Sequence, residues 1–231
     1  MKLVIKKLKL ILCFLLTVLM FELSYAQDWA NLKRFQKENT ELISSKRDAS
    51  RIIFMGNSIT EGWLTLRPQF FVNEHYINRG ISGQTTPQML LRFRQDVINL
   101  KPSTVVILAG INDIAENTGP STIDMIINNI ISMVELATTN HIKTILCSVL
   151  PAYDFPWKPG LKPAEKVMNL NALLKSYATK HDILFVDYFS AMVNESNGLK
   201  KELTSDGVHP NIAGYLIMEP LLENAIDLIQ N

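Results

Sequence analysis

The sequence predicts an α/β fold in which crossover helices connect the strands of a parallel sheet. From Arg51 onward, short runs that are apolar throughout alternate with longer stretches of helical periodicity. In a sheet with one solvent-exposed face, apolar and polar residues alternate along each strand. These runs do not alternate, so both faces of the sheet are expected to be covered. No repeat, low-complexity tract or Gly/Ser linker interrupts the pattern, and one domain is predicted.

The expected strands are short and separated by the expected helices. Four apolar runs predict buried strands, and a weaker run predicts a fifth: residues 52–55, 105–109, 142–149, 183–186 and, more weakly, 75–78. The expected helices span residues 29–44, 86–100, 121–140, 164–180 and 211–229. The first of these helices is expected to pack outside the sheet. Pro102 ends the helix at 86–100, and Pro210 begins the last one.

The first 26 residues are typical of a secretory signal peptide. A stretch with four lysines precedes 12 apolar residues, 10–21, and Ser24-Tyr25-Ala26 predicts cleavage after Ala26. An uncleaved membrane anchor is the rival interpretation, but 12 apolar residues fall short of the roughly 20 that span a bilayer. Lipid modification of Cys13 is a weaker third interpretation, because the preceding position holds leucine rather than a small residue.

The mature chain, residues 27–231, is therefore predicted to be periplasmic or extracellular, with no membrane span. The leader carries four of the 23 basic and one of the 22 acidic residues, which leaves a net charge of about −2. That balance argues against a nucleic-acid partner. Only Cys147 remains in the mature chain, so no intramolecular disulfide can form, and its apolar surroundings predict a buried inert thiol.

Ser58 is the candidate nucleophile, because it follows the apolar run 52–55 where a buried strand ends. A serine hydroxyl needs a base within hydrogen-bond reach, and the base needs an orienting partner. The segment Asp206-Gly207-Val208-His209 offers both on one turn. Asp206 would orient the imidazole, and His209 would take the serine proton.

Asp206 and His209 could instead be two ligands of a metal ion. A zinc site needs at least one more ligand at suitable spacing, and the sequence holds no His-Glu-x-x-His stretch and no cysteine pair. His75, His141 and His181 are each isolated in sequence. Metal catalysis is therefore the less favoured interpretation.

Two further loops follow predicted strands and could supply hydrogen-bond donors to an oxyanion. Residues 78–83 contain glycines that allow a backbone N–H to turn inward, and residues 110–113 present an asparagine amide at the same edge of the sheet. Taken alone, each loop has the composition of an ordinary turn. Their combination with Ser58 and His209 is what points to a site.

A long connection, residues 151–160, follows the strand predicted at 142–149 and carries three aromatic residues and three prolines. Ligands of open α/β sheets bind beyond the carboxyl ends of the strands, so Tyr153 and Trp157 are candidate substrate contacts. The alternative is that Phe155 and Trp157 only fill the core beneath the loop. The sequence leaves both interpretations open.

Four blocks in this order resemble conserved blocks of the SGNH hydrolases, also called the GDSL lipase and esterase family: Gly56-Asn57-Ser58, Gly80-Ile81-Ser82-Gly83, Gly110-Ile111-Asn112-Asp113 and Asp206-Gly207-Val208-His209. The similarity spans roughly residues 51–215. Within the family, the chain most resembles the branch of platelet-activating-factor acetylhydrolase catalytic subunits and bacterial carbohydrate acetylesterases.

The resemblance implies a three-layer α/β/α sandwich of the flavodoxin type and a Ser58, His209, Asp206 triad. It also implies three oxyanion donors, namely the backbone N–H groups of Ser58 and Gly83 and the side chain of Asn112. No metal or organic cofactor is implied. Asn57 departs from the family by replacing the aspartate of Gly-Asp-Ser, which keeps an acceptor oxygen but removes a charge.

The α/β-hydrolase family is excluded, because Thr60 stands at the position of the last glycine in that family's Gly-x-Ser-x-Gly elbow. The favoured hypothesis is an exported serine ester hydrolase that removes small acyl groups, acetyl above all, from carbohydrates. One alternative is a lipid-directed esterase, such as a lysophospholipase, short-chain lipase or thioesterase. The other is a non-enzymatic envelope binding protein that retains the fold. The oligomeric state does not follow from the sequence.

Overall fold

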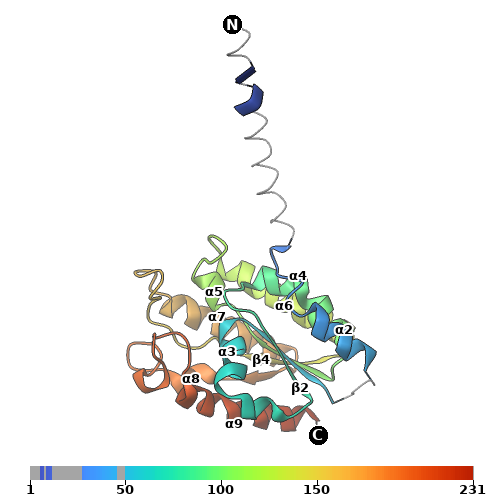
Figure 1. The fold of residues 1–231 in the computed structure, drawn as a ribbon. Coiled ribbons are helices and arrows are strands. Elements are labelled where there is room, and N and C mark those ends of the chain that lie inside the picture. Colours follow the sequence, from blue (N-terminus) through green and yellow to red (C-terminus); the bar gives the residue numbers. More distant parts are fainter. Residues whose placement is uncertain (1–5, 8, 12–27, 46–49, 231) are drawn as a thin grey trace.

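The computed structural model describes residues 6–7, 9–11, 28–45 and 50–230. Its centre is a five-stranded parallel sheet with strand order β2-β1-β3-β4-β5 (Figure 1). The strands are β1 Ile52–Gly56, β2 Tyr76–Gly80, β3 Thr104–Leu108, β4 Lys143–Cys147 and β5 Leu184–Val186. The predicted α/β class with a five-stranded parallel sheet is confirmed.

Helices cover both faces of this sheet, as the apolar strand runs predict (Figure 1). One face carries α4 Thr86–Asp96, α6 Ile123–Thr139 and α7 Ala164–Lys180, with α2 Gln36–Ser44 beside them. The other face carries α3 Ser58–Leu66, α8 Tyr188–Met192 and α9 Ile212–Gln230. Residues 28–230 also hold the short helix α5, Ile111–Ile114, and the 3-10 turns Pro68–Val72, Ile98–Leu100 and Lys201–Leu203.

The chain runs from β1 outward to β2 and then returns across β1 to β3. The carboxyl ends of β1 and β3 therefore form the switch point at which doubly wound sheets bind ligands. Every residue of β1 and β3 is buried. Each fully buried Ile, Val or Leu side chain contributes about 1.5–3 kcal/mol through the hydrophobic effect, so the edge of the sheet beyond them is held rigidly.

Two glycines let α3 approach the ends of the strands closely. A Cβ on Gly56 would lie 1.9 Å from Thr60 Oγ1, and a Cβ on Gly80 would lie 2.2 Å from the backbone nitrogen of Glu61. No real side chain tolerates such contacts. The glycines of the first two sequence blocks thus fix how the helix that begins at Ser58 lies over β1 and β2.

The predicted helix over residues 29–44 is wrong in its first half, because α2 begins only at Gln36. Residues 28–35 form turns instead. The side chain of Asp28 accepts hydrogen bonds from the backbone nitrogens of Leu32 and Lys33, and Asn31 has a positive φ of 54°. These local bonds compete with the helical ones and end the regular pattern.

Two further elements are shorter than the sequence predicts. The strand expected to reach residue 149 ends at Cys147, because both backbone groups of Val149 bond to the side chain of Asn171, at 2.7 and 2.9 Å. The helix expected to reach residue 100 ends at Asp96 and continues as a 3-10 turn. Helix α3 was not predicted; it is only nine residues long.

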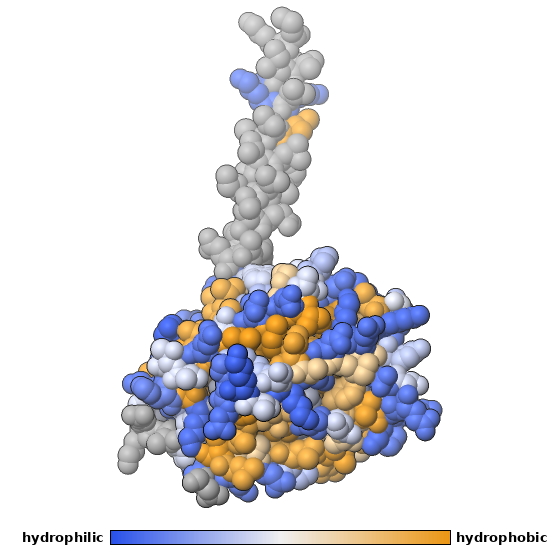
Figure 2. Space-filling view, turned by 180° about the vertical axis from the view of Figure 1, so that it is seen from behind, coloured by the Kyte–Doolittle hydropathy of each residue, from blue (hydrophilic) through white to orange (hydrophobic). Residues whose placement is uncertain are grey.

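The predicted signal peptide, with its cleavage after Ala26 and the rival Cys13 lipidation, lies largely outside the described residues and stays a prediction. Within the described ranges, no helix combines the length and apolar character needed to cross a bilayer. On the face turned away from the view of Figure 1, apolar residues lie among hydrophilic ones (Figure 2).

Candidate active site

Ser58 is the first residue of α3, and only Asn57 separates it from the carboxyl end of β1. Asn57 is buried and caps the helix, its side-chain oxygen accepting from the backbone nitrogen of Ile59 at 3.3 Å. The acceptor that asparagine shares with aspartate is thus the one in use. The N–H of Ser58 belongs to the first turn, whose amides have no partner within the helix. Hydroxyl and N–H are therefore both available beyond the sheet.

Ser58, His209 and Asp206 form one hydrogen-bonded chain. Ser58 Oγ lies 2.9 Å from His209 Nε2, and His209 Nδ1 lies 2.6 Å from Asp206 Oδ2. The carboxylate can only accept, so Nδ1 carries the imidazole proton and Nε2 accepts from the serine hydroxyl. This is the arrangement in which an imidazole can remove a serine proton.

The turn at residues 204–209 holds this chain in place. Asp206 Oδ1 accepts from the backbone nitrogens of Val208, at 2.9 Å, and His209, at 2.8 Å, while the Thr204 hydroxyl donates to the His209 carbonyl at 2.7 Å. Partial burial alone would raise the pKa of Asp206, but the hydrogen bonds from His209 and Val208 outweigh it and lower that pKa. The carboxylate is therefore ionised at neutral pH.

The loop after β2 carries Gly83, whose φ of +77° is a conformation that favours glycine. Its carbonyl accepts from Asn117 Nδ2 at 3.1 Å. The preceding residue, Ser82, donates its backbone N–H to Glu61 Oε2 at 2.8 Å and its hydroxyl to the same oxygen. Both ends of the loop are thus tied to neighbouring elements.

Asn112 lies in α5, beyond the end of β3, and is buried. Its Nδ2 donates to the carbonyl of Gln84 at 3.0 Å, so the structure brings Asn112 to the loop that carries Gly83. One amide proton is used by this bond, and the second remains for another acceptor. The two predicted oxyanion residues therefore meet at one edge of the sheet.

Asp113, the residue after Asn112, connects the loop after β3 to the segment that follows Gly83 and Gln84. Its carboxylate accepts from the backbone nitrogen of Thr86 at 3.0 Å and from the Thr86 hydroxyl at 2.6 Å, at the start of α4. Burial raises the pKa of Asp113 to about 6, although the bonds from Thr86 act in the opposite direction. The ionised form is thus costly in this position.

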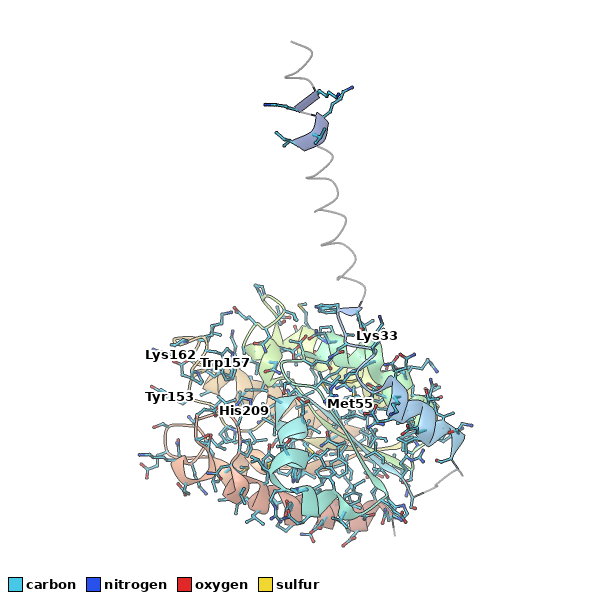
Figure 3. The ribbon with its side chains drawn as sticks, viewed as in Figure 1. Lys33, Met55, Tyr153, Trp157, Lys162 and His209 are labelled. Carbon is cyan, nitrogen blue, oxygen red and sulfur yellow. The ribbon has the colours of Figure 1, made fainter. Side chains whose placement is uncertain are left out.

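In the aromatic loop 151–160, Phe155 fills the core, as one interpretation expects, and Trp157 is exposed, as the other interpretation expects. Phe155 is fully buried, whereas Trp157 is 46 % exposed and its ring centroid lies 5.8 Å from that of His209. Tyr153 is also exposed. Trp157, Tyr153 and His209 lie in the same part of the molecule, away from Lys33 (Figure 3). The indole is therefore an exposed apolar surface beside the imidazole.

Several residues that support the site were not predicted from the sequence. Lys158 Nζ pairs with Glu116 at 2.6 Å and so ties the aromatic loop to the segment after α5. Glu61, Gln84 and Asn117 hold the loop of Gly83. Glu61 lies one helical turn after Ser58. This spacing is the one feature of the sequence that could have indicated that Glu61 lies near the site.

The remaining reactive groups lie away from these residues. Cys147 is buried, and burial raises the pKa of its thiol to about 12, as expected of an inert thiol. His181 packs on Tyr177, with ring centroids 4.3 Å apart. Across the described part of the chain, no group of three or more His, Cys, Asp or Glu side chains could hold a metal ion.

The GDSL-like lipase/acylhydrolase family model matches residues 54–217, which includes all four sequence blocks. The chain belongs to this family. A solved GDSL-like lipase from Bacteroides thetaiotaomicron is 52 % identical, with a TM-score of 0.83, over 86 % of this chain and 98 % of that one. This protein is accordingly a carboxylic ester hydrolase that acts on a small-molecule ester.

More distant relatives share most of the chain. The human platelet-activating factor acetylhydrolase IB subunit alpha2 is 25 % identical over 89 % of both chains. Esterase TesA of Pseudomonas aeruginosa is 26 % identical over 79 % of this chain and 89 % of its own. An acetylxylan esterase from Geobacillus stearothermophilus, 22 % identical with a TM-score of 0.59 over 78 % of this chain and 96 % of that one, has the same fold.

The substitution Asp113→Asn tests the cost of the buried carboxylate. Between about pH 4 and pH 6 the folded wild type keeps a proton that its unfolded chain has released, because the pKa rises from 3.8 to about 6 on folding. Wild-type stability should therefore fall relative to the variant as pH rises through this window, by at most about 1.4 kcal/mol per pH unit. Urea unfolding at a series of pH values measures the difference, and a difference independent of pH would contradict the raised pKa.

Proposed function

We propose that this protein is an exported serine ester hydrolase that removes small acyl groups, above all acetyl, from carbohydrates. The observation that carries the proposal is the hydrogen-bonded chain from Ser58 through His209 to Asp206. Export to the periplasm or beyond rests on the leader sequence, residues 1–26.

In the first half of the reaction, Ser58 Oγ attacks the ester carbonyl carbon while His209 Nε2 takes its proton. Asp206 keeps the imidazole in the reactive tautomer and stabilises the imidazolium. The negative oxygen of the tetrahedral intermediate accepts from the N–H groups of Ser58 and Gly83 and from Asn112 Nδ2. Collapse breaks the bond to the alcohol oxygen, which takes the proton from His209 and leaves an acyl-enzyme.

In the second half, His209 removes a proton from water, and the resulting hydroxide oxygen attacks the acyl carbon. The same oxyanion donors hold the second tetrahedral intermediate. Its collapse returns the proton to Ser58 Oγ and releases the carboxylic acid. No step in this sequence needs a metal ion or an organic cofactor.

Trp157 supports a carbohydrate as the alcohol part of the ester. The leaving oxygen must lie within reach of His209 to receive its proton, so the alcohol occupies the space beside the imidazole. Trp157 is half exposed at that place, with its ring 5.8 Å from that of His209. An indole face offers a large apolar surface of the kind on which the C–H groups of a sugar ring pack. Tyr153, exposed on the same loop, would extend that surface.

Ser58→Ala should lower kcat/KM for p-nitrophenyl acetate by at least about 10³-fold, since the covalent step is lost. Ser196→Ala, in an exposed loop, is the matched control and should behave as wild type. Acetate release from acetylated oligosaccharides, measured with both variants, extends the comparison to sugars. Turnover that persists in Ser58→Ala would remove this serine from the mechanism.

A comparison of two esters separates small acyl groups from lipid chains. The side chains of Asn112 and Asn117 at the oxyanion loop are polar, whereas a long acyl chain would need an apolar groove. We therefore expect kcat/KM to be higher for the acetyl than for the octanoyl ester of p-nitrophenol. A strong preference for octanoyl would favour a lysophospholipase, short-chain lipase or thioesterase instead.

Trp157→Ala tests the role of the indole in sugar binding. Loss of the indole should raise KM for an acetylated oligosaccharide about tenfold, which corresponds to about 1.4 kcal/mol of stacking. The kcat/KM for p-nitrophenyl acetate should change by less than about threefold, since the triad is intact. Trp157→Phe keeps an aromatic face and should recover part of the sugar affinity. Equal losses on both substrates would contradict a role in sugar binding.

A further inference from the structure

A buried chain of polar groups joins the N-terminal segment, residues 28–44, to the loop that carries Gly83. Gln84 Nε2 donates to the carbonyl of Ala30 at 2.7 Å. The side-chain oxygen of Gln84 accepts from Arg92 Nε, and Arg92 Nη1 pairs with Asp96 Oδ2 at 3.0 Å. The side chains of Arg92 and Asp96 are at most 1 % exposed. A connected and buried network therefore begins one residue beyond Gly83.

Arg92 also contacts the strand ends from which the site is built. Its Nη2 donates to the carbonyl of Gly56 and to that of Arg79, each at 2.9 Å. Gly56 lies two residues before Ser58, and Arg79 lies four residues before Gly83. A fully buried guanidinium is stable only when its donors are satisfied, so these carbonyls and Gln84 are held in fixed relative positions.

The N-terminal segment reaches the same network a second time through Asn39 of α2. Asn39 Nδ2 donates to Asp96 Oδ1 at 2.6 Å, and Asn39 Oδ1 accepts from Arg79 Nε at 3.1 Å and Nη2 at 2.8 Å. Arg79 also packs against the ring of Phe35, with 4.5 Å between its guanidinium carbon and the ring centroid. Asp96 Oδ1 and the Nε and Nη2 of Arg79 therefore have these partners only when this segment is docked.

Gln84 connects the buried polar network to the proposed oxyanion hole. Its backbone carbonyl accepts from Asn112 Nδ2, while its side chain bonds to Ala30 and Arg92. A shift of Gln84 would move the adjacent Gly83 amide and remove a restraint on the Asn112 side chain. Displacements of about 1 Å at a reacting centre cost up to about 10² in rate.

We propose that Gln84 and Arg92 are positioning residues for the oxyanion hole, and that docking of residues 28–44 through Ala30 and Asn39 completes this hole. The proposal rests on the proposed function, because the oxyanion donors are part of it. It makes the segment directly after the predicted cleavage site a part of the catalytic machinery.

Gln84→Met in the full chain tests the proposal, because methionine has a similar shape and neither hydrogen bond. With p-nitrophenyl acetate, kcat should fall about 10- to 100-fold while KM stays within about twofold, since the donors act on the transition state. Gln95→Met is the comparison variant. Gln95 also donates to the N-terminal segment, at the Leu32 carbonyl, but does not bond to the loop of Gly83. Its kcat should fall by less than that of Gln84→Met, because the segment keeps its bonds through Ala30 and Asn39.

Gln84→Glu separates the two anchors. The carboxylate can still accept from Arg92 Nε but cannot donate to Ala30. A loss in kcat smaller than that of Gln84→Met, but clear against wild type, supports a part for the N-terminal segment. Wild-type kcat in Gln84→Glu would overturn that part, and wild-type kcat in Gln84→Met would overturn the whole proposal.

A double-mutant cycle with Asn112→Ala tests whether Gln84 acts through the oxyanion hole. Once the Asn112 donor is lost, Gln84→Met should cost less than it does in the wild-type background. Strictly additive losses would contradict positioning. Amide hydrogen exchange provides a readout besides activity: residues 81–86 should exchange faster in Gln84→Met than in Gln95→Met. If wild type shows no Ser58-dependent hydrolysis, the proposed function fails by itself, and the exchange data still decide whether Gln84 holds the loop.

Discussion

The register of the three central strands is the constraint on which the site depends. Gly56 pairs with Gly80 on one side and with Leu108 on the other, so the carboxyl ends of β2, β1 and β3 are level. Neighbouring strands lie about 4.8 Å apart, and residues that follow level ends emerge side by side. Ser58, Gly83 and Asn112 are therefore neighbours although each comes from a different loop. A slip of one residue in the pairing of a strand would move its end out of level with the others and separate these three residues.

The fourth part of the site, His209, comes from no strand end, and its distance from Ser58 is set by contact between two helices. The Tyr215 hydroxyl in α9 donates to the Ile59 carbonyl in α3 at 2.8 Å. Further along the same interface, the buried Glu219 accepts two hydrogen bonds from Arg67, each 2.9 Å. Because His209 lies just before α9 and Ser58 begins α3, these bonds fix the stagger that brings imidazole and hydroxyl within 2.9 Å.

Much of this arrangement could be predicted from the sequence, because apolar runs mark strands and polar residues directly after them mark the edge of the sheet. The Asp-x-x-His spacing of Asp206 and His209 is local, so one turn suffices to predict their contact. Trp157 was harder. Composition alone could not separate it from Phe155, since both are large aromatics in one loop and only the packing of the loop decides which is exposed.

What the sequence could not predict are polar contacts between distant segments. Helical periodicity predicted residues 29–35 as helix, yet their carbonyls accept from glutamine side chains of α4 and the preceding loop, such as Gln84 to Ala30 and Gln95 to Leu32. A turn of helix would have engaged some of these carbonyls in its own bonds. The bonds of Asp28 end the helical pattern at the N-terminus and leave the Ala30 carbonyl for Gln84, which anchors the loop that carries Gly83. A pattern of hydrophobicity reports neither contact. Residues that act through such contacts look like ordinary surface glutamines until the fold brings their partners to them.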